Sequence, residues 1–118
     1  MKDFVEKHEF AFIMGYMKCG VWAEELEYAN CQLSDETRNR MWDDCLEFLE
    51  KAQDLIPNNQ WEQAGHDFWL TRNGHGTGFW DRPEIYGEEN AKKLTEISES
   101  YGNYDLIVDD ETNQIDGY

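Results

Sequence analysis

Residues 66–82 read HDFWLTRNGHGTGFWDR, and this stretch decides the fold that the sequence predicts. Its first part, residues 66–72, is aromatic and β-branched, and its last part, residues 79–82, returns with two more aromatic residues. Between them, residues 74–78 hold three glycines in five positions, which permits a turn with positive φ. The pattern predicts a β-hairpin over residues 66–82, with Trp69 and Trp80 in the core of a small sheet.

Downstream of this stretch the sequence predicts one helix and then a strand. The helix runs from about Glu88 to Tyr101, because apolar residues recur on one face, and Gly102 stands where a C-terminal cap belongs. Residues 104–108 are strand-like, and residues 111–114 are expected to turn the chain back through Ile115.

Upstream, the sequence is mainly helical. Apolar spacing predicts a helix over residues 3–18, which Gly20 is expected to break, with a second short helical piece over residues 21–29. The next helix has the clearest signals: Ser34 as N-cap, acidic residues in the first turn, and an end at Ile56-Pro57-Asn58. We therefore expect an α+β fold with N-terminal helices, a small antiparallel sheet built on the hairpin, one further helix and a C-terminal strand.

A length of 118 residues suits one domain over residues 1–118, and an aromatic content of 14% supplies material for a core. Residues 1–60 form the mainly helical, acidic part of that domain, and residues 61–118 form the hairpin, helix and strand part. The three cysteines have no C-x-x-C spacing and are expected to be reduced. No signal peptide and no apolar run of membrane-spanning length is visible, so we expect a cytoplasmic protein.

Charge is the strongest compositional feature. The chain has 26 acidic residues against 10 Lys and Arg, a net charge of −16, with −8 in residues 1–65 and −8 in residues 66–118. Such a body repels nucleic acids and anionic membranes, so direct binding to either is not expected. A partner with a basic surface fits this charge.

The residues best suited to chemistry are His66, Asp67, His75 and Asp81. In a hairpin, His75 would lie at the far turn, about 20 Å from the others at roughly 3.3 Å per strand residue, which opposes a shared metal site. His66 and Asp81 remain possible as an acid and base pair; alternatively Asp81 pairs with Arg72 or Arg82 and the group holds the hairpin together. The glycine-rich turn could cradle a phosphate, but it lacks the lysine of a P-loop, and turn geometry explains it. We expect no catalysis, no cofactor and no metal.

The same stretch carries a resemblance. Residues 64–82, AGHDFWLTRNGHGTGFWDR, resemble a segment that recurs in uncharacterised bacteriophage and prophage proteins, which share the pattern HDFWLTRNGHGxGFWDR. Downstream, Leu94-Thr95-Glu96, Tyr101-Gly102 and Leu106-Ile107-Val108-Asp109-Asp110 are also similar to that family. The resemblance covers roughly residues 64–118 and implies a phage source and a fold, but no reaction.

Together these features predict a phage-encoded acidic binding protein in the cytoplasm of the host cell. Its carboxylates would imitate DNA phosphates on a host protein with a basic nucleic-acid-binding surface, such as a nuclease or a CRISPR effector, and inhibit it in the anti-CRISPR or antirestriction manner. The expected contact residues are Glu24, Glu25, Glu27, Asp43, Asp44, Glu47 and Glu50. The alternatives are a small metal-binding protein or hydrolase that uses His66, Asp67 and Asp81, or a phage accessory protein with a purely structural role.

Overall fold

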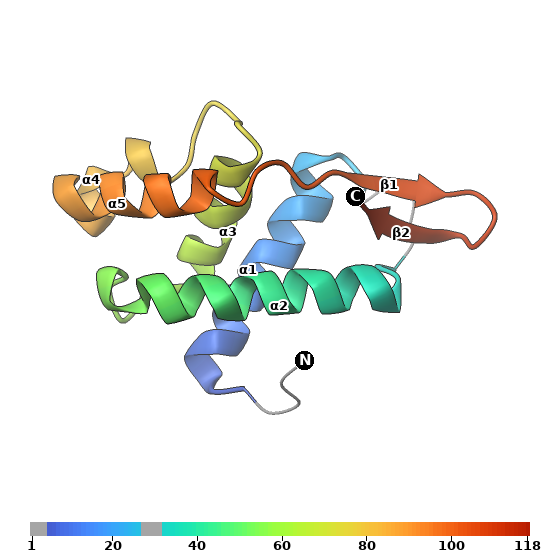
Figure 1. Cartoon of the computed structure of the whole chain (residues 1–118), viewed down its shortest axis with the longest axis horizontal. Helices are drawn as coiled ribbons and strands as arrows, with labels where there is room; N and C mark the ends of the chain where they lie inside the picture. The colour runs from blue at the N-terminus through green and yellow to red at the C-terminus, as the bar shows by residue number, and fades with distance from the viewer. Residues whose placement is uncertain (1–4, 27–31) are drawn as a thin grey trace.

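The computed structural model describes residues 5–26 and 32–118, in which helices dominate and a small sheet closes the chain (Figure 1). The α+β class predicted from the sequence is confirmed. The elements follow in the order α1 (Lys7–Ala23), α2 (Asp35–Ala52), the 3₁₀ turn η2 (Gln53–Leu55), α3 (Trp61–Arg72), the 3₁₀ turn η3 (Phe79–Asp81), α4 (Pro83–Tyr86), α5 (Glu88–Glu99), β1 (Leu106–Asp109) and β2 (Gln114–Gly117).

Helices α1 and α3 form the central pair. The ring of His8 contacts that of Trp61 near the start of both helices, and Gly20 lies against Trp69 further along, so the two helices run in the same direction. They meet backbone to backbone at two glycines. A Cβ on Gly15 would overlap the carbonyl of Glu62, and a Cβ on Gly65 would overlap the carbonyl of Phe12. Only glycine permits this approach.

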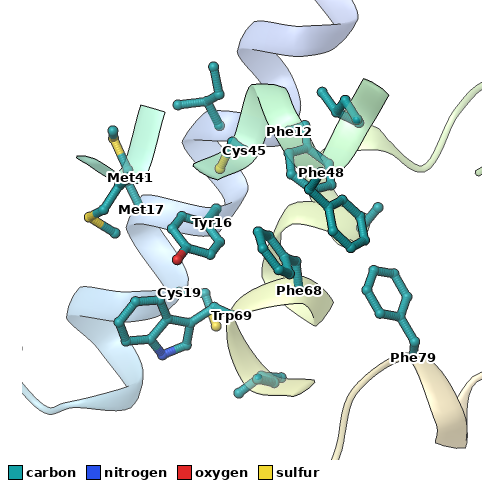
Figure 2. Close-up of a cluster of buried hydrophobic side chains, with 14 of the residues drawn as sticks. Phe12, Tyr16, Met17, Cys19, Met41, Cys45, Phe48, Phe68, Trp69 and Phe79 are labelled. Atoms are coloured by element: carbon teal, nitrogen blue, oxygen red, sulfur yellow. The ribbon is translucent and has the colours of Figure 1, made fainter. Parts of the chain in front are cut away.

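Helix α2 crosses this pair and completes the core. Its start is as predicted, because the Ser34 side chain accepts the backbone N–H of Thr37 at 3.2 Å. Figure 2 shows side chains from α1, α2, α3 and η3 converging in one cluster. Phe48 of α2 stacks on Phe68 of α3 with ring centroids 4.1 Å apart, and Phe12 of α1 stacks on Phe48 at 5.5 Å. The core therefore joins residues from both predicted parts of the chain.

The sheet is a two-stranded antiparallel hairpin at the C-terminal end, with Leu106 opposite Gly117 and Asp109 opposite Gln114. The turn over residues 110–113 uses Asn113 at φ 59°, as the predicted reversal through Ile115 requires. The hairpin is tied to the start of α2, because Ser34 donates its N–H to the Ile115 carbonyl at 2.9 Å and Gly117 donates to the Thr37 hydroxyl at 2.9 Å. The strand and its return are confirmed.

The β-hairpin predicted over residues 66–82 is wrong. Residues 66–72 are the second half of helix α3, residues 79–81 are η3, and Pro83 opens α4. The aromatic and β-branched residues that suggested a strand are instead needed to fill space around a central helix. Trp69 is fully buried as predicted, whereas Trp80, also predicted in the core, is 52% exposed.

The predicted bounds of the first helix also need correction. Helix α1 runs through Gly20 to Ala23 because that glycine lies against Trp69 and Leu106, where its missing side chain leaves room. Residues 27–29 of the predicted second piece lie outside the described residues. Helix α5 is confirmed, but it ends at Glu99 with Ser100 as its C-cap, before the predicted end at Tyr101 and cap at Gly102. Gly102 has φ 71° in the segment that follows. Across residues 5–26 and 32–118, no helix is both long and apolar enough to cross a membrane.

Candidate partner-binding surface

The outer face of α2 carries a line of exposed carboxylates. Positions 36, 43, 47 and 50 fall on one side of the helix, since their spacing follows the 3.6-residue period. Asp43, Glu47 and Glu50 are exposed, as the sequence predicted. Within the described part of the chain, no ion pair engages Asp43 or Glu50. These two carboxylates therefore remain available to a partner.

Glu47 is exposed but has partners. Its carboxylate accepts the hydroxyl of Tyr101 at 2.9 Å and lies 3.6 Å from the ammonium of Lys51. Burial of the ring, and then the bond to Glu47, raise the pKa of Tyr101 above its ordinary value. Glu47 thus links the outer face of α2 to the segment after α5, and its charge is partly compensated.

Asp44 does not lie on the outer face, contrary to the sequence prediction. Its side chain is only 17% exposed, and it accepts from Arg72 at 3.0 Å and from Arg40 at 3.3 Å. Asp44 lies one position from Asp43, and the helical turn of about 100° per residue takes it toward the core. We therefore assign Asp44 a structural role.

The partner of Asp44, Arg72, is the most deeply buried cation in the described residues, with 1% of its side chain exposed. It donates to the Tyr16 hydroxyl at 2.9 Å and to the carbonyls of Gly102 and Tyr101 at 2.8 and 3.2 Å. Burial opposes its charge, but the interactions with Tyr16 and Asp44 outweigh that effect and raise the pKa of Arg72. This network fastens the ends of α3 and α5 to α1 and α2.

The second predicted acidic group lies at the end of α1. Glu24 is the C-cap residue and is half-buried, whereas Glu25 is exposed at φ 57°. Glu25 borders an open hollow of about 800 Å³, together with Trp22, His75 and Thr77. Glu27, the third member predicted here, lies outside the described residues. For the two described members, Glu24 and Glu25, no ion pair joins the group to the acidic face of α2.

The residues that the sequence marked as best suited to chemistry, His66, Asp67, His75 and Asp81, have separate surroundings in the structure. Asp67 is fully buried, and its oxygens accept from Arg82 at 2.8 Å, from the Tyr86 hydroxyl at 2.8 Å and from Gln63 at 3.0 Å. Burial and the neighbouring Asp67 raise the pKa of Tyr86 well above its ordinary value, which keeps it protonated as a donor. Asp67 therefore joins α3 to α4 and is shielded from solvent.

His66 and Asp81 do not form the acid and base pair that the sequence left possible. The His66 ring lies 5.8 Å from that of Trp22, on the α1 side of α3. Asp81 instead closes η3, where it accepts the N–H of Gly78 at 3.0 Å and the hydroxyl of Thr77 at 2.8 Å. Although desolvation acts in the opposite direction, these two bonds lower the pKa of Asp81 below its ordinary value.

The ion pairs predicted for Asp81 are also different, because Arg72 pairs with Asp44 and Arg82 pairs with Asp67. His75 lies in the loop after α3, beside the hollow near Trp22. The glycine-rich segment, residues 74–78, connects α3 to η3 and does not open a helix of phosphate-binding length. Its role here is to reverse the chain, with Gly74 at φ 68° and Gly78 at φ 151°.

Among the described residues, no group of three or more His, Cys, Asp or Glu side chains is arranged to hold a metal ion. Cys19 and Cys45 are free thiols in the core, and burial raises the pKa of Cys19 to about 12 and that of Cys45 well above its ordinary value. Such thiols are poor nucleophiles at neutral pH.

Comparison with known protein families, with curated proteins and with solved structures gives no match. The resemblance of residues 64–82 to phage proteins stays a prediction. The sequence analysis placed Trp80 in the core and named Arg72 only as a possible partner of Asp81. It therefore missed Arg72 as a buried anchor and Trp80 as an exposed aromatic residue. A signal existed for Arg72: Ala64, Phe68 and Arg72 recur every four residues, which is the spacing of one helix face.

Proposed function

We propose that this chain is a phage-encoded acidic binding protein whose α2 face occupies the basic nucleic-acid groove of a host defence protein, a nuclease or a CRISPR effector, and inhibits it. The observation that supports the proposal is the exposed line of carboxylates on a helix held rigidly against the core. Asp43 and Glu50 carry the binding, because neither has a partner among the described residues.

The spacing of the carboxylates suits this role. From Glu36 to Glu50 the helix axis rises about 21 Å at 1.5 Å per residue, and four carboxylates fall along that length. This is one charge per roughly 7 Å, about half the linear density of a single DNA strand at one phosphate per 3.4 Å. The net charge of −16 adds a long-range field that accelerates encounter with a basic protein.

A hydrolytic or metal-dependent function at His66, Asp67 and Asp81 has less support. The Asp67 carboxylate already holds Arg82 and Tyr86, so it is not poised for proton transfer or for metal binding. Asp81 is engaged in the turn at η3. If the protein had a purely structural accessory role in the phage, removing the α2 carboxylates would not change binding to any host protein.

The test is capture on the immobilised protein from a bacterial lysate, followed by elution with short duplex DNA. We expect a basic nucleic-acid-binding protein to be retained at low salt, to be displaced by DNA, and to lose its activity on DNA when the acidic protein is added. Retention of no such protein, or retention that DNA does not reverse, contradicts the proposal.

The matched variants separate the acidic face from the general charge. Asp43→Asn with Glu50→Gln removes two charges from α2, and Asp110→Asn with Glu111→Gln removes two from the turn between β1 and β2. All four side chains are exposed, so both double variants should fold normally. Only the α2 variant is expected to weaken capture, by about tenfold if each charge contributes roughly 0.7 kcal/mol.

A further inference from the structure

Trp80 is an exposed aromatic residue on a rigid support. Its side chain is 52% exposed, although the residues on either side in η3 are firmly held. Phe79 is fully buried, stacks near Phe48 with ring centroids 6.0 Å apart, and donates its N–H to the Thr71 hydroxyl at 3.1 Å. Because the turn is anchored from the core side, the indole is presented to solvent without freedom to withdraw into the core.

The other side of the turn is fixed as well. Asp81 accepts from Thr77 and from the Gly78 backbone, and Arg82 donates to the buried carboxylate of Asp67 at 2.8 Å. Exposed tryptophans on such fixed supports are typical anchors of protein interfaces, since little conformational entropy is lost when they bind.

Trp80 stands at the edge of a groove of about 470 Å³ between η3, α4 and α5, the elements that lie together at the end of the molecule away from the sheet (Figure 1). The groove is lined by Trp80, Pro83, Glu88, Ala91, Lys92, Thr95, Glu96 and Glu99. Its apolar part is the indole, the proline ring and Ala91. Its charged part holds three carboxylates and one ammonium, so the groove is net acidic.

The polar groups of the groove set its chemistry. The Thr95 hydroxyl already donates to the Ala91 carbonyl at 2.8 Å, so it offers no free donor to an anionic ligand. Glu96 and Glu99 are exposed, and within the described part of the chain no ion pair engages either carboxylate. An aromatic face beside unpaired carboxylates is complementary to a flat cation that can stack and donate hydrogen bonds at once.

We propose that this groove binds an arginine side chain from a basic segment of a partner protein, with the guanidinium stacked on Trp80 and paired with the carboxylates of Glu96 and Glu99. Arginine fits better than lysine, because its planar group can lie on the indole while its N–H groups reach carboxylates at the edge. This inference goes beyond the proposed function: it concerns α5 and η3, not α2, and it does not require a partner that binds nucleic acid.

The experiment uses the whole protein and an end-blocked peptide with two arginines among glycines. The chain has five tryptophans, so the indole N–H region of a ¹H–¹⁵N spectrum is simple, and the signal lost in Trp80→Phe assigns Trp80. We expect the Trp80 signal to shift most on titration. Trp80→Ala should lower the affinity for the peptide by about 5- to 30-fold, which corresponds to the free energy of a partly desolvated cation–π contact.

Charge controls separate a built groove from general attraction to an acidic body. Glu96→Gln with Glu99→Gln should lower the affinity for the arginine peptide by about tenfold. Asp43→Asn with Glu50→Gln also removes two charges, but it should change that affinity by less than about twofold. The matching lysine peptide should bind more weakly, and the citrulline peptide should not bind.

Two results would overturn the inference. One is an equal loss of binding in both charge variants with no effect of Trp80→Ala, which would show attraction to the acidic body alone. The other is no shift of the Trp80 signal at any peptide concentration. Thermal unfolding of each variant checks that it is folded, which the exposure of all five side chains leads us to expect. If no protein is captured in a way that DNA reverses, but the arginine peptide still binds at Trp80, the proposed function is refuted and the inference about this groove is not.

Discussion

Gly65→Ala tests whether the backbone contact between α1 and α3 holds the fold together. Intrinsic propensity alone favours the substitution, because alanine stabilises a helix interior by about 1 kcal/mol relative to glycine. In this structure, however, the added Cβ would overlap the backbone carbonyl of Phe12. The two effects have opposite signs, so the sign of the measured change decides which one governs.

The magnitude follows from what the methyl group meets. Overpacking a core typically costs about 1–3 kcal/mol, and the upper end applies here because a helix backbone cannot rotate away as a flexible side chain can. Subtracting the gain of about 1 kcal/mol in propensity leaves a loss of about 2 kcal/mol in the free energy of unfolding. For a chain of this length that corresponds to a melting temperature lower by roughly 8 °C.

Urea and thermal unfolding of a graded series provide the assay. Gly76→Ala has nothing within 4 Å of the new Cβ and should change stability by less than about 0.5 kcal/mol. Gly20→Ala meets side-chain atoms of Leu106 and Trp69 at 3.2 and 3.3 Å, so its loss should fall between the other two. A Gly65→Ala protein more stable than the parent by about 1 kcal/mol would refute the reasoning.

Two further predictions concern side chains that sequence patterns treat alike. Trp69→Ala should lower the free energy of unfolding, followed by circular dichroism, by about 3–5 kcal/mol, since the indole is fully buried. Trp80→Ala should lower it by less than about 1 kcal/mol, and equal losses would mean that Trp80 is also a core residue. Asp44→Asn should lower stability by about 3 kcal/mol because it leaves the charge of Arg72 buried and underpaired, while Asp43→Asn should be neutral; equal melting temperatures would show that the buried pair contributes nothing.

The helices that lie at the surface were predictable because each has one buried face. The spacing of Met41, Cys45 and Leu49 and the cap at Ser34 identify α2 from the sequence, and α5 has the same kind of stripe. The C-terminal strand and its reversal were also predictable, since a polar turn separates the apolar residues 106–108 from Ile115. In each case a local pattern and its environment agree.

The prediction of residues 66–72 as a strand, where the structure has helix α3, was wrong for a physical reason. It is buried between α1, α2 and α5, so residues from Asp67 to Arg72 are all buried and the apolar periodicity disappears. Phe68, Trp69 and Thr71 favour strands on average, but packing against the surrounding helices overrides that preference. The error at Trp80 followed from it, because residues assigned to a strand were also assigned to the core.

The acidic contact residues were partly predictable. Asp43, Glu47 and Glu50 are exposed because their spacing places them opposite the apolar stripe. Asp44 has the same charge and lies beside Asp43, yet it faces a buried arginine that comes 28 residues later in the chain. A long-range partner of this kind leaves no local trace, so its role becomes visible only in the fold.

The salt dependence of binding to the captured partner tests the central claim most directly. The affinity should fall steeply as salt rises, and Asp43→Asn with Glu50→Gln should both weaken binding by about tenfold at low salt and flatten that dependence, because the two charges no longer contribute. The double variant at the turn between β1 and β2, Asp110→Asn with Glu111→Gln, should keep the slope of the parent protein. An affinity that is independent of salt, or that responds equally to both double variants, would contradict the assignment of binding to the α2 face.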